Sequence, residues 1–298
     1  MKNITQTIQK NIKLASHAGF CYGVKRAVET VKKLKIQNPE KNICILGELI
    51  HNSQIIKELE DMGIKTVNEI PQEGFDICVV RSHGASFEVF EQIKNNGLEL
   101  VDLTCPDVKK VQNRATELVK DGYFLIILGK PEHPEVMAIE IDALAEAQNS
   151  DFIFVAPSLE SLKDIEKRIS KASKIGVVVQ TTQRIEFLQE VLNFLIPISR
   201  ELKVLNTICA STSLRQNEAR ELAKESDLMI VVGSKKSANT THLAEILEGI
   251  TQTIHIETAS ELEQYATIIE GAKNIGTTAG ASTPDYIIQE VIKRLKGE

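Results

Sequence analysis

Six short apolar runs recur along the chain, and each ends in a glycine or a polar residue. They are "NICILG" (42–47), "FDICVVR" (75–81), "YFLIILG" (123–129), "KIGVVVQ" (174–180), "DLMIVVG" (227–233) and "KNIGTTAG" (273–280). Longer amphipathic stretches separate them, and this alternation is typical of α/β folds built on parallel or mixed sheets. Such folds bind ligands at the carboxyl ends of their strands. The polar loops after these runs are therefore the first candidates for a functional site.

One sequence plan occurs three times. A strand-like run leads into a cysteine turn and then into a helix that carries basic residues, in "IKLASHAGFCYGVKRAVETVKKL", "LELVDLTCPDVKKVQNRATELVK" and "LKVLNTICASTSLRQNEARELAKE". The next run ends in Gly47, Gly129 and Gly233, which lie 26, 24 and 24 positions beyond the respective cysteines. A third run ends in "VVRSHGAS", "VVVQTTQR" and "IGTTAGAS". We predict three similar α/β units with pseudo-threefold symmetry, over residues 1–102, 103–205 and 206–298.

The composition excludes several classes of protein. The formal net charge is -6, and hydrophobic and charged residues make up 42% and 26% of the 298 residues. These values are ordinary for a folded globular protein and argue against a general nucleic-acid binder. The sequence has neither an apolar run of membrane-spanning length nor the apolar core of a secretory signal. We expect a cytoplasmic protein with no membrane or nucleic-acid partner, in which the five cysteines are reduced thiols or metal ligands.

The five cysteines fall into two groups. Cys44 and Cys78 lie inside apolar runs, where a thiol behaves as a small core side chain. Cys21, Cys105 and Cys209 follow strands and precede helices, so backbone N–H groups and the helix dipole favour their thiolates. Equivalent positions in a repeat predict that these three thiols share one site.

The spacing of the three thiols favours an iron–sulfur cluster over zinc. A structural zinc site takes four protein ligands, usually through short CxxC pairs, and the sequence has no such pair. Iron–sulfur clusters accept widely spaced thiolates. A [4Fe–4S] cluster held by three cysteines would leave one iron without a protein thiolate. Such an open coordination position makes redox and Lewis-acid chemistry possible.

Polar loops after the other strands resemble a binding site for an anion. His51, His83 and His133 occupy the polar ends of strands, and further loops are rich in hydroxyl groups, amides and glycine: "QTT" (180–182), "SKKSANTT" (234–241) and "TAGAST" (278–283). Hydroxyl groups, backbone N–H groups and helix N-termini donate hydrogen bonds to phosphate oxygens. Taken singly, each loop is better explained as a helix cap. Together they predict a site for a diphosphate.

One carboxylate lies within these loops. Glu135 follows His133 by two residues in "EHPEV" and is the candidate proton donor, although a carboxylate in the first turn of a helix also stabilises the helix dipole. The remaining histidines are given lesser roles. We expect His242 and His255 to be structural or solvent-facing, and His17 to support the Cys21 turn at most.

The motifs occur in the order found in one enzyme family. "GFCYGV", "ELIHN", "SHG", "TCPDVKKV", "HPEV", "QTT", "VVGSKKSAN" and "TAGASTPD" make the chain resemble the 4-hydroxy-3-methylbut-2-enyl diphosphate reductases, the last enzymes of the methylerythritol phosphate route to isoprenoids. The resemblance runs from about residue 12 to the C-terminus, and we interpret the preceding residues as a short extension. It implies three α/β domains in a trefoil around a central [4Fe–4S] cluster, with Cys21, Cys105 and Cys209 as ligands.

The resemblance also implies a mechanism and partners. The substrate hydroxyl would bind the open iron and leave as water after two electrons enter, giving isopentenyl and dimethylallyl diphosphate. Glu135 would deliver protons, Thr181 would link it to the hydroxyl, and His133 would support both this relay and the diphosphate. A ferredoxin or flavodoxin system would supply electrons to a monomer or homodimer. The diphosphate would be bound by His51, His83, His133, Thr181, Ser237, Ala238, Asn239 and Ser282.

Some positions depart from the family pattern, Ala238 among them, and two other functions stay open. Ala238 stands where many members carry another serine, so one phosphate contact would be lost or made by the backbone. A non-catalytic iron–sulfur sensor or scaffold would explain the thiols but not Glu135 and Thr181. A hydrolase with the three loop histidines as metal ligands would leave the cysteines unexplained.

Overall fold

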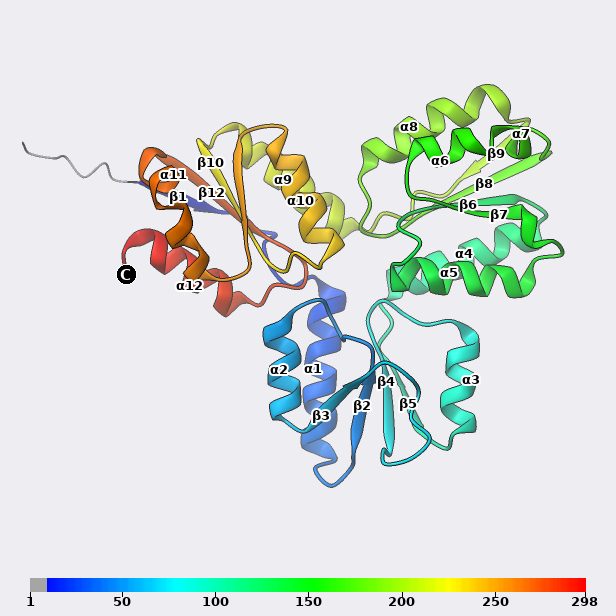
Figure 1. The fold of residues 1–298 in the computed structure, drawn as a ribbon, viewed down its shortest axis with the longest axis horizontal. Coiled ribbons are helices and arrows are strands. Elements are labelled where there is room, and N and C mark those ends of the chain that lie inside the picture. The colour runs from blue at the N-terminus through cyan, green and yellow to red at the C-terminus, as the bar shows by residue number, and fades with distance from the viewer. Residues whose placement is uncertain (1–9) are drawn as a thin grey trace, which may run out of the picture. The chain divides into compact units, whose positions relative to one another are not determined.

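A computed structural model of the protein describes residues 10–298, so most of the predicted N-terminal extension lies outside the described residues. Residues 10–298 form three parallel sheets of four strands each, with helices between the strands (Figure 1). All six predicted strands are present. The α/β fold class is therefore confirmed.

The first sheet has the strand order β3-β2-β4-β5. The sheet and its helices are formed by the chain from α1, the helix that follows Cys21, to β5. Cys44 on β2 and Cys78 on β4 lie opposite each other in the strand register, and both belong to the apolar core of this sheet. Its elements are α1 (Tyr22–Gln37), β2 (Ile43–Leu46), α2 (Ser53–Asp61), β3 (Ile64–Val67), β4 (Ile77–Val80), α3 (Phe87–Asn95) and β5 (Glu99–Asp102).

The second sheet repeats this order as β7-β6-β8-β9. Helices α4 and α5 pack side by side on one face, around Val111, Leu118 and Val136, while α6, α7 and α8 cover the other face (Figure 1). The strands are buried on both faces, which explains their continuous apolar sequences. The elements are α4 (Pro106–Lys120), β6 (Phe124–Leu128), α5 (Pro134–Glu146), η1 (Ser150–Phe152), β7 (Ile153–Ala156), α6 (Leu159–Asp164), α7 (Glu166–Ile169), β8 (Lys174–Val179), α8 (Ile185–Leu195), η2 (Ile196–Ile198) and β9 (Glu201–Val204).

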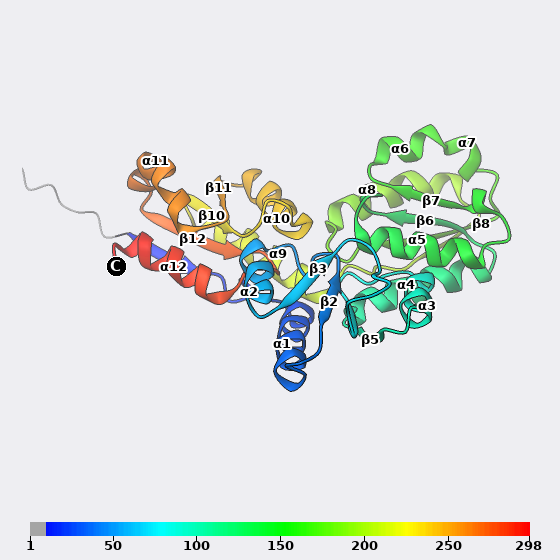
Figure 2. The ribbon, with the colours of Figure 1, turned by 60° about the horizontal axis from the view of Figure 1, so that its bottom comes forward.

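The third sheet contains strands from both ends of the chain. Its order is β11-β10-β12-β1, and α12 packs on the face that includes Ile275 and Ile230 (Figure 2). The elements are β1 (Asn11–Leu14), α9 (Ala210–Lys224), β10 (Leu228–Val232), α10 (Ala238–Glu248), β11 (Gln252–Ile256), η3 (Ala259–Tyr265), α11 (Ala266–Gly271), β12 (Asn274–Ala279) and α12 (Asp285–Lys296).

The position of β1 was not anticipated from the sequence. This strand lies within the predicted unit 1–102, yet it pairs with β12, with Asn11 opposite Asn274. β5 and β9 are also edge strands, and each lies shortly before a cysteine in the sequence: β5 before Cys105 and β9 before Cys209. Each sheet therefore ends in the strand that leads into another cysteine turn. The predicted boundaries near residues 102 and 205 follow β5 and β9 and stay a prediction.

Contacts divide the chain into two compact units. We call residues 10–22, His51–Ser53 and Ala210–Glu298 the N/C unit, and Gly23–Ile50 with Gln54–Cys209 the central unit. The N/C unit holds the third sheet and the central unit holds the other two. Among the helices of residues 10–298, none combines the length and apolar character that crossing a membrane requires.

Candidate active site

The three predicted cluster ligands occupy equivalent turns. Cys105 is the N-cap of α4, and Cys21 and Cys209 come directly before α1 and α9. Each cysteine N–H donates to a carbonyl in the loop after a central strand: Cys105 to Ser82 (3.0 Å), Cys209 to Thr181 (3.0 Å) and Cys21 to Ala281 (3.2 Å). These three carbonyls lie in the loops that the sequence repeat had aligned. The structure thus has the same turn in three places.

Exposure separates the cysteines as the sequence predicts. Cys44 and Cys78 are completely buried, whereas Cys21, Cys105 and Cys209 are partly exposed. All five, each within residues 10–298, are thiols rather than half-cystines. The hydrogen bond with Cys44, together with burial, raises the pKa of Cys78 and keeps that thiol protonated.

The three turns suit an iron–sulfur cluster by their chemistry. Each places a partly exposed sulfur at a helix N-terminus, where the dipole favours a thiolate. In the central unit, Gly23 keeps space beside Cys105, because a Cβ at Gly23 would lie 2.8 Å from the Cys105 Sγ. A bulky inorganic group needs such room around its ligands. The donor set therefore fits the predicted cluster.

Glu135 is a buried carboxylate with two donors. It lies in the first turn of α5 and is 1% exposed. The Thr181 N–H donates to its Oε1 and the Thr181 hydroxyl to its Oε2, both at 2.7 Å. Burial raises the pKa of Glu135 to about 7, although the two bonds from Thr181 act in the opposite direction. The group can therefore hold or release a proton near neutral pH.

His133 fixes the start of the helix that carries Glu135. As the N-cap of α5, its Nδ1 accepts a hydrogen bond from the Glu135 N–H at 3.2 Å, and Pro134 occupies the first helical position. Because Nδ1 is the acceptor in this bond, Nε2 is the ring nitrogen left to face other partners. The ring meets that of His83 edge-on, with centroids 5.4 Å apart.

Two residues that the sequence did not indicate hold the His83 loop. Asp142 on α5 accepts a bond from the Phe87 N–H at 2.7 Å. Gln112 on α4 donates to the Ala85 carbonyl at 3.0 Å and to Asp142 at 3.2 Å. The loop after β4 is thereby tied to the helices of the second sheet. The contacts with Phe87 and Ala85 are made to backbone groups, which carry no sequence signal.

The N/C unit carries the predicted phosphate ligands. Ser237 is the N-cap of α10, and Ala238 and Asn239 begin that helix. Ser237, Asn239 and Ser282 are about 5% exposed, and the Asn239 Nδ2 has no hydrogen-bond partner among the described residues. Ser282 Oγ donates weakly to the His51 carbonyl, at 3.4 Å. Buried donors at a helix N-terminus are suited to an anion.

The predicted residues thus form two groups. The central unit brings together Cys105, Cys209, His83, His133, Glu135 and Thr181. The N/C unit contains Cys21, His51, Ser237, Ala238, Asn239 and Ser282. That all twelve residues serve one site stays a prediction.

The histidines with lesser expected roles have structural contacts. His242 is buried on α10. The His255 Nε2 lies 2.8 Å from the Gly233 carbonyl, and burial lowers the pKa of that ring. His17 contacts Glu218, a residue that the sequence did not indicate.

Comparison with known proteins identifies the family. Residues 12–296 match the LytB protein family. The chain belongs to the LytB family. One relative, the 4-hydroxy-3-methylbut-2-enyl diphosphate reductase of Syntrophotalea carbinolica, is 40% identical over 283 residues, which cover 95% of this chain and 97% of that protein. The resemblance predicted from the ordered motifs is confirmed.

Solved structures agree with this LytB assignment. The chain is similar to an (E)-4-hydroxy-3-methyl-but-2-enyl diphosphate reductase described as the terminal enzyme of the non-mevalonate pathway. The TM-score is 0.70 at 37% identity, over 97% of this chain and all of that one. It is also similar to the E-1-hydroxy-2-methyl-but-2-enyl-4-diphosphate reductase of Plasmodium falciparum. There the TM-score is 0.84 at 26% identity, over 96% of this chain and 88% of that one.

Proposed function

We propose that the protein reduces (E)-4-hydroxy-3-methylbut-2-enyl diphosphate to isopentenyl and dimethylallyl diphosphate. The C–O bond of the allylic alcohol breaks, two electrons and two protons are consumed, and the oxygen leaves as water. Membership of the LytB family and the names of its relatives support this activity. The observation that carries it is the buried Glu135–Thr181 pair, beside the turn of one predicted cluster ligand.

Cys21, Cys105 and Cys209 would hold a [4Fe–4S] cluster, which suits their partly exposed positions at three helix N-termini. When bound, such a cluster supplies electrons and, at the iron without a cysteine, a Lewis acid for the substrate oxygen. A ferredoxin or flavodoxin system would be the electron donor.

Glu135 is suited to the proton transfer. A general acid works best when its pKa is close to the operating pH, and burial places that of Glu135 at about 7. Thr181 donates a hydrogen bond to each carboxylate oxygen and so holds the carboxyl group in one orientation. It also accepts the Cys209 N–H through its carbonyl, which ties the acid to a ligand turn. His133 fixes the first turn of the helix.

The diphosphate would be bound by side-chain hydrogen-bond donors, of which Ser237, Asn239 and Ser282 are buried. The unpaired Asn239 amide, the Ser237 N-cap of α10 and Ser282 are present in the N/C unit, and His83 and His133 in the central unit. His51 completes the set implied by the family. Surrounding the anion with protein donors would exclude water and orient the reacting carbon. Ala238 offers only its backbone.

The alternative is an iron–sulfur sensor that performs no catalysis. It would use the same three thiols. A sensor has no need for a buried acid whose pKa lies near neutrality, and this favours the reductase. Turnover of the substrate with a low-potential donor separates the two functions.

Protein purified without oxygen tests the cluster and its ligands. We expect iron and acid-labile sulfide at about four each per chain, and turnover with reduced methyl viologen. Serine at Cys21, Cys105 or Cys209 should remove most of the iron, whereas the control variants Cys44→Ser and Cys78→Ser should keep it. Equal loss in all five variants, or colourless zinc protein, would contradict the proposal. A full cluster without turnover would favour the sensor.

A further inference from the structure

We propose that Arg26 and Arg215 are positioning residues that hold the backbone in front of two predicted cluster ligands, Cys105 and Cys21. The inference rests on the proposed role of these thiols. Each arginine lies in the helix that follows one cysteine, and its guanidinium binds main-chain carbonyls just before another cysteine.

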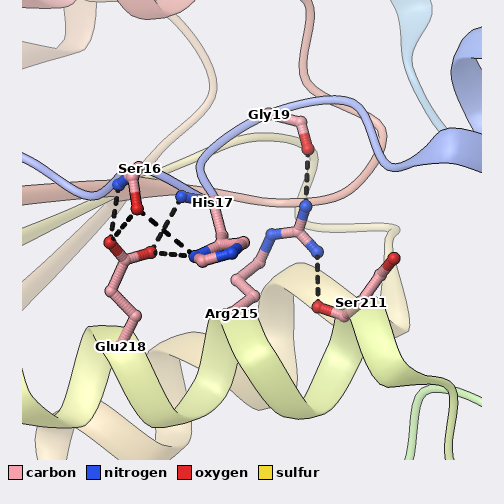
Figure 3. Close-up of polar contacts among 6 residues, drawn as sticks. All are labelled: Ser16, His17, Gly19, Ser211, Arg215 and Glu218. Carbon is pink, nitrogen blue, oxygen red and sulfur yellow. Dashed lines mark hydrogen bonds and ion pairs between the residues drawn. The ribbon is translucent and has the colours of Figure 1, made fainter.

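Arg215 is the buried member of the pair. It is 3% exposed and lies on α9, six positions after Cys209. Its Nη2 donates to the Gly19 carbonyl at 2.6 Å, and its Nη1 lies 3.4 Å from the Ser211 carbonyl (Figure 3). Gly19 is two residues before Cys21 and has a φ of +89°, which disfavours other residues. The guanidinium therefore fixes an unusual backbone conformation.

Glu218 holds the same loop one turn further along α9. Its Oε1 accepts from the Ser16 N–H at 2.7 Å and from the Ser16 hydroxyl at 2.5 Å. Its Oε2 accepts from the His17 N–H and contacts the His17 Nδ1, both at 2.8 Å (Figure 3). Two side chains of opposite charge on one helix thus bind the loop from Ser16 to Gly19.

Arg26 makes the corresponding contact in the central unit. It lies on α1, five positions after Cys21, and its Nη2 donates to the carbonyls of Leu103 (3.2 Å) and Thr104 (2.7 Å). Thr104 immediately precedes Cys105 and is 2% exposed. Its N–H also donates to the Asp102 carboxylate at 2.9 Å. The turn in front of Cys105 is held from two sides, like the loop in front of Cys21.

Arginine suits this role for two reasons. Its charge is permanent, and charge-assisted hydrogen bonds are about twice as strong as neutral ones. A cation near thiolate ligands also favours the added negative charge of a reduced cluster. Partners that orient metal ligands typically change metal retention by about 10- to 100-fold when removed. Arg26 and Arg215 should therefore affect how firmly the cluster is held and how easily it is reduced.

The experiment compares Arg26→Gln and Arg215→Gln with the control Arg114→Gln. Arg114 lies on α4, after Cys105, and its guanidinium makes an exposed ion pair with Glu117. Iron release to a chelator without oxygen should be roughly tenfold faster in both test variants and unchanged in the control. Their reduction potentials should become more negative and the EPR signal of the reduced cluster should change, at unaltered circular dichroism.

Amide hydrogen exchange on the cluster-free chain makes the test specific. Arg215→Gln should speed exchange in residues 16–21, and Arg26→Gln in residues 102–105, each without the other. Wild-type exchange and iron release in both variants would overturn the inference. A wild-type protein that binds no cluster would instead contradict the proposed function, and the exchange pattern alone would then decide whether the two arginines position these turns.

Discussion

Glu135 and Glu218 are two hydrogen-bonded glutamates with opposite properties. Glu135 is 1% exposed and accepts two bonds, and its burial raises the pKa to about 7. The side chain of Glu218 is 28% exposed. Burial also acts to raise the pKa of Glu218, but the bonds from Ser16 and His17 outweigh it and lower the pKa to about 2.

The difference between these two sites lies in the balance between solvent and donors. Glu135 loses nearly all its water and regains only the two bonds from Thr181, so its proton is held until about neutral pH. Glu218 keeps some water and gains a set of four contacts, so it stays ionised throughout the physiological range. The first arrangement suits a group that moves a proton. The second suits a fixed anion that holds a loop.

The largest expected effect is on turnover. Glu135→Gln keeps the shape of the side chain but removes the proton that the proposed reaction needs. We expect kcat to fall by about 10²- to 10⁴-fold, with iron content and substrate binding retained. The matched variant Glu218→Gln, which loosens the loop from Ser16 to Gly19 but leaves Glu135 in place, should lower kcat far less. Wild-type turnover in Glu135→Gln would remove this residue from the proton transfer and leave the two glutamates functionally alike.

The second prediction concerns stability as the pH changes. Because the folded-state pKa of Glu135 is above its usual value of 4.5, folding favours the protonated form. Its contribution is fully present below pH 4.5 and is lost as the pH rises through about 7. The loss is at most about 3 kcal/mol. Thermal unfolding of both proteins between pH 4.5 and 8 should therefore show that, as the pH rises, the melting temperature of the wild type falls relative to that of Glu135→Gln. Parallel pH curves for the two proteins would contradict the raised pKa.

The smallest effect is expected at Glu218, with the opposite sign. A lowered pKa contributes stability above pH 4.5, and this contribution is lost as the pH falls toward about 2. We expect Glu218→Gln to cost about 1 to 2 kcal/mol at pH 7, reduced from the full shift because the group is partly solvated. The cost should shrink as the pH is lowered from 5 to 3. Chemical denaturation at each pH measures it, and a cost that stays constant would mean that the charge of Glu218 has no part in holding the loop.

Much of the fold and of the site could be predicted because its signals are local and repeated. The six apolar runs became strands, since a strand buried on both faces must be continuously apolar. Cys44 and Cys78 were separated from the other cysteines by their apolar neighbours, and their complete burial agrees.

The contacts that could not be predicted join positions far apart in the chain. β1 pairs with a strand 263 residues away, and nothing in "NIKL" specifies that partner. Arg26, Arg215 and Glu218 bind mainly to backbone groups or to short loops. A backbone carbonyl that accepts, or a backbone N–H that donates, belongs to every residue type alike, so from the sequence each of these side chains is recognisable only as a charge on a helix.

The pairing of β1 with β12 also sets the order in which the protein can be completed during synthesis. β1 is made first, but its partner follows 263 residues later, which is roughly 13 to 50 s at translation rates of about 5 to 20 residues per second. The hydrogen bond from the Cys21 N–H to the Ala281 carbonyl likewise cannot form until Ala281 has been synthesised. The central unit can fold while the ribosome is still working. The Cys21 turn can therefore reach the conformation seen in the structure only after Ala281 has been synthesised, later than the whole of the central unit.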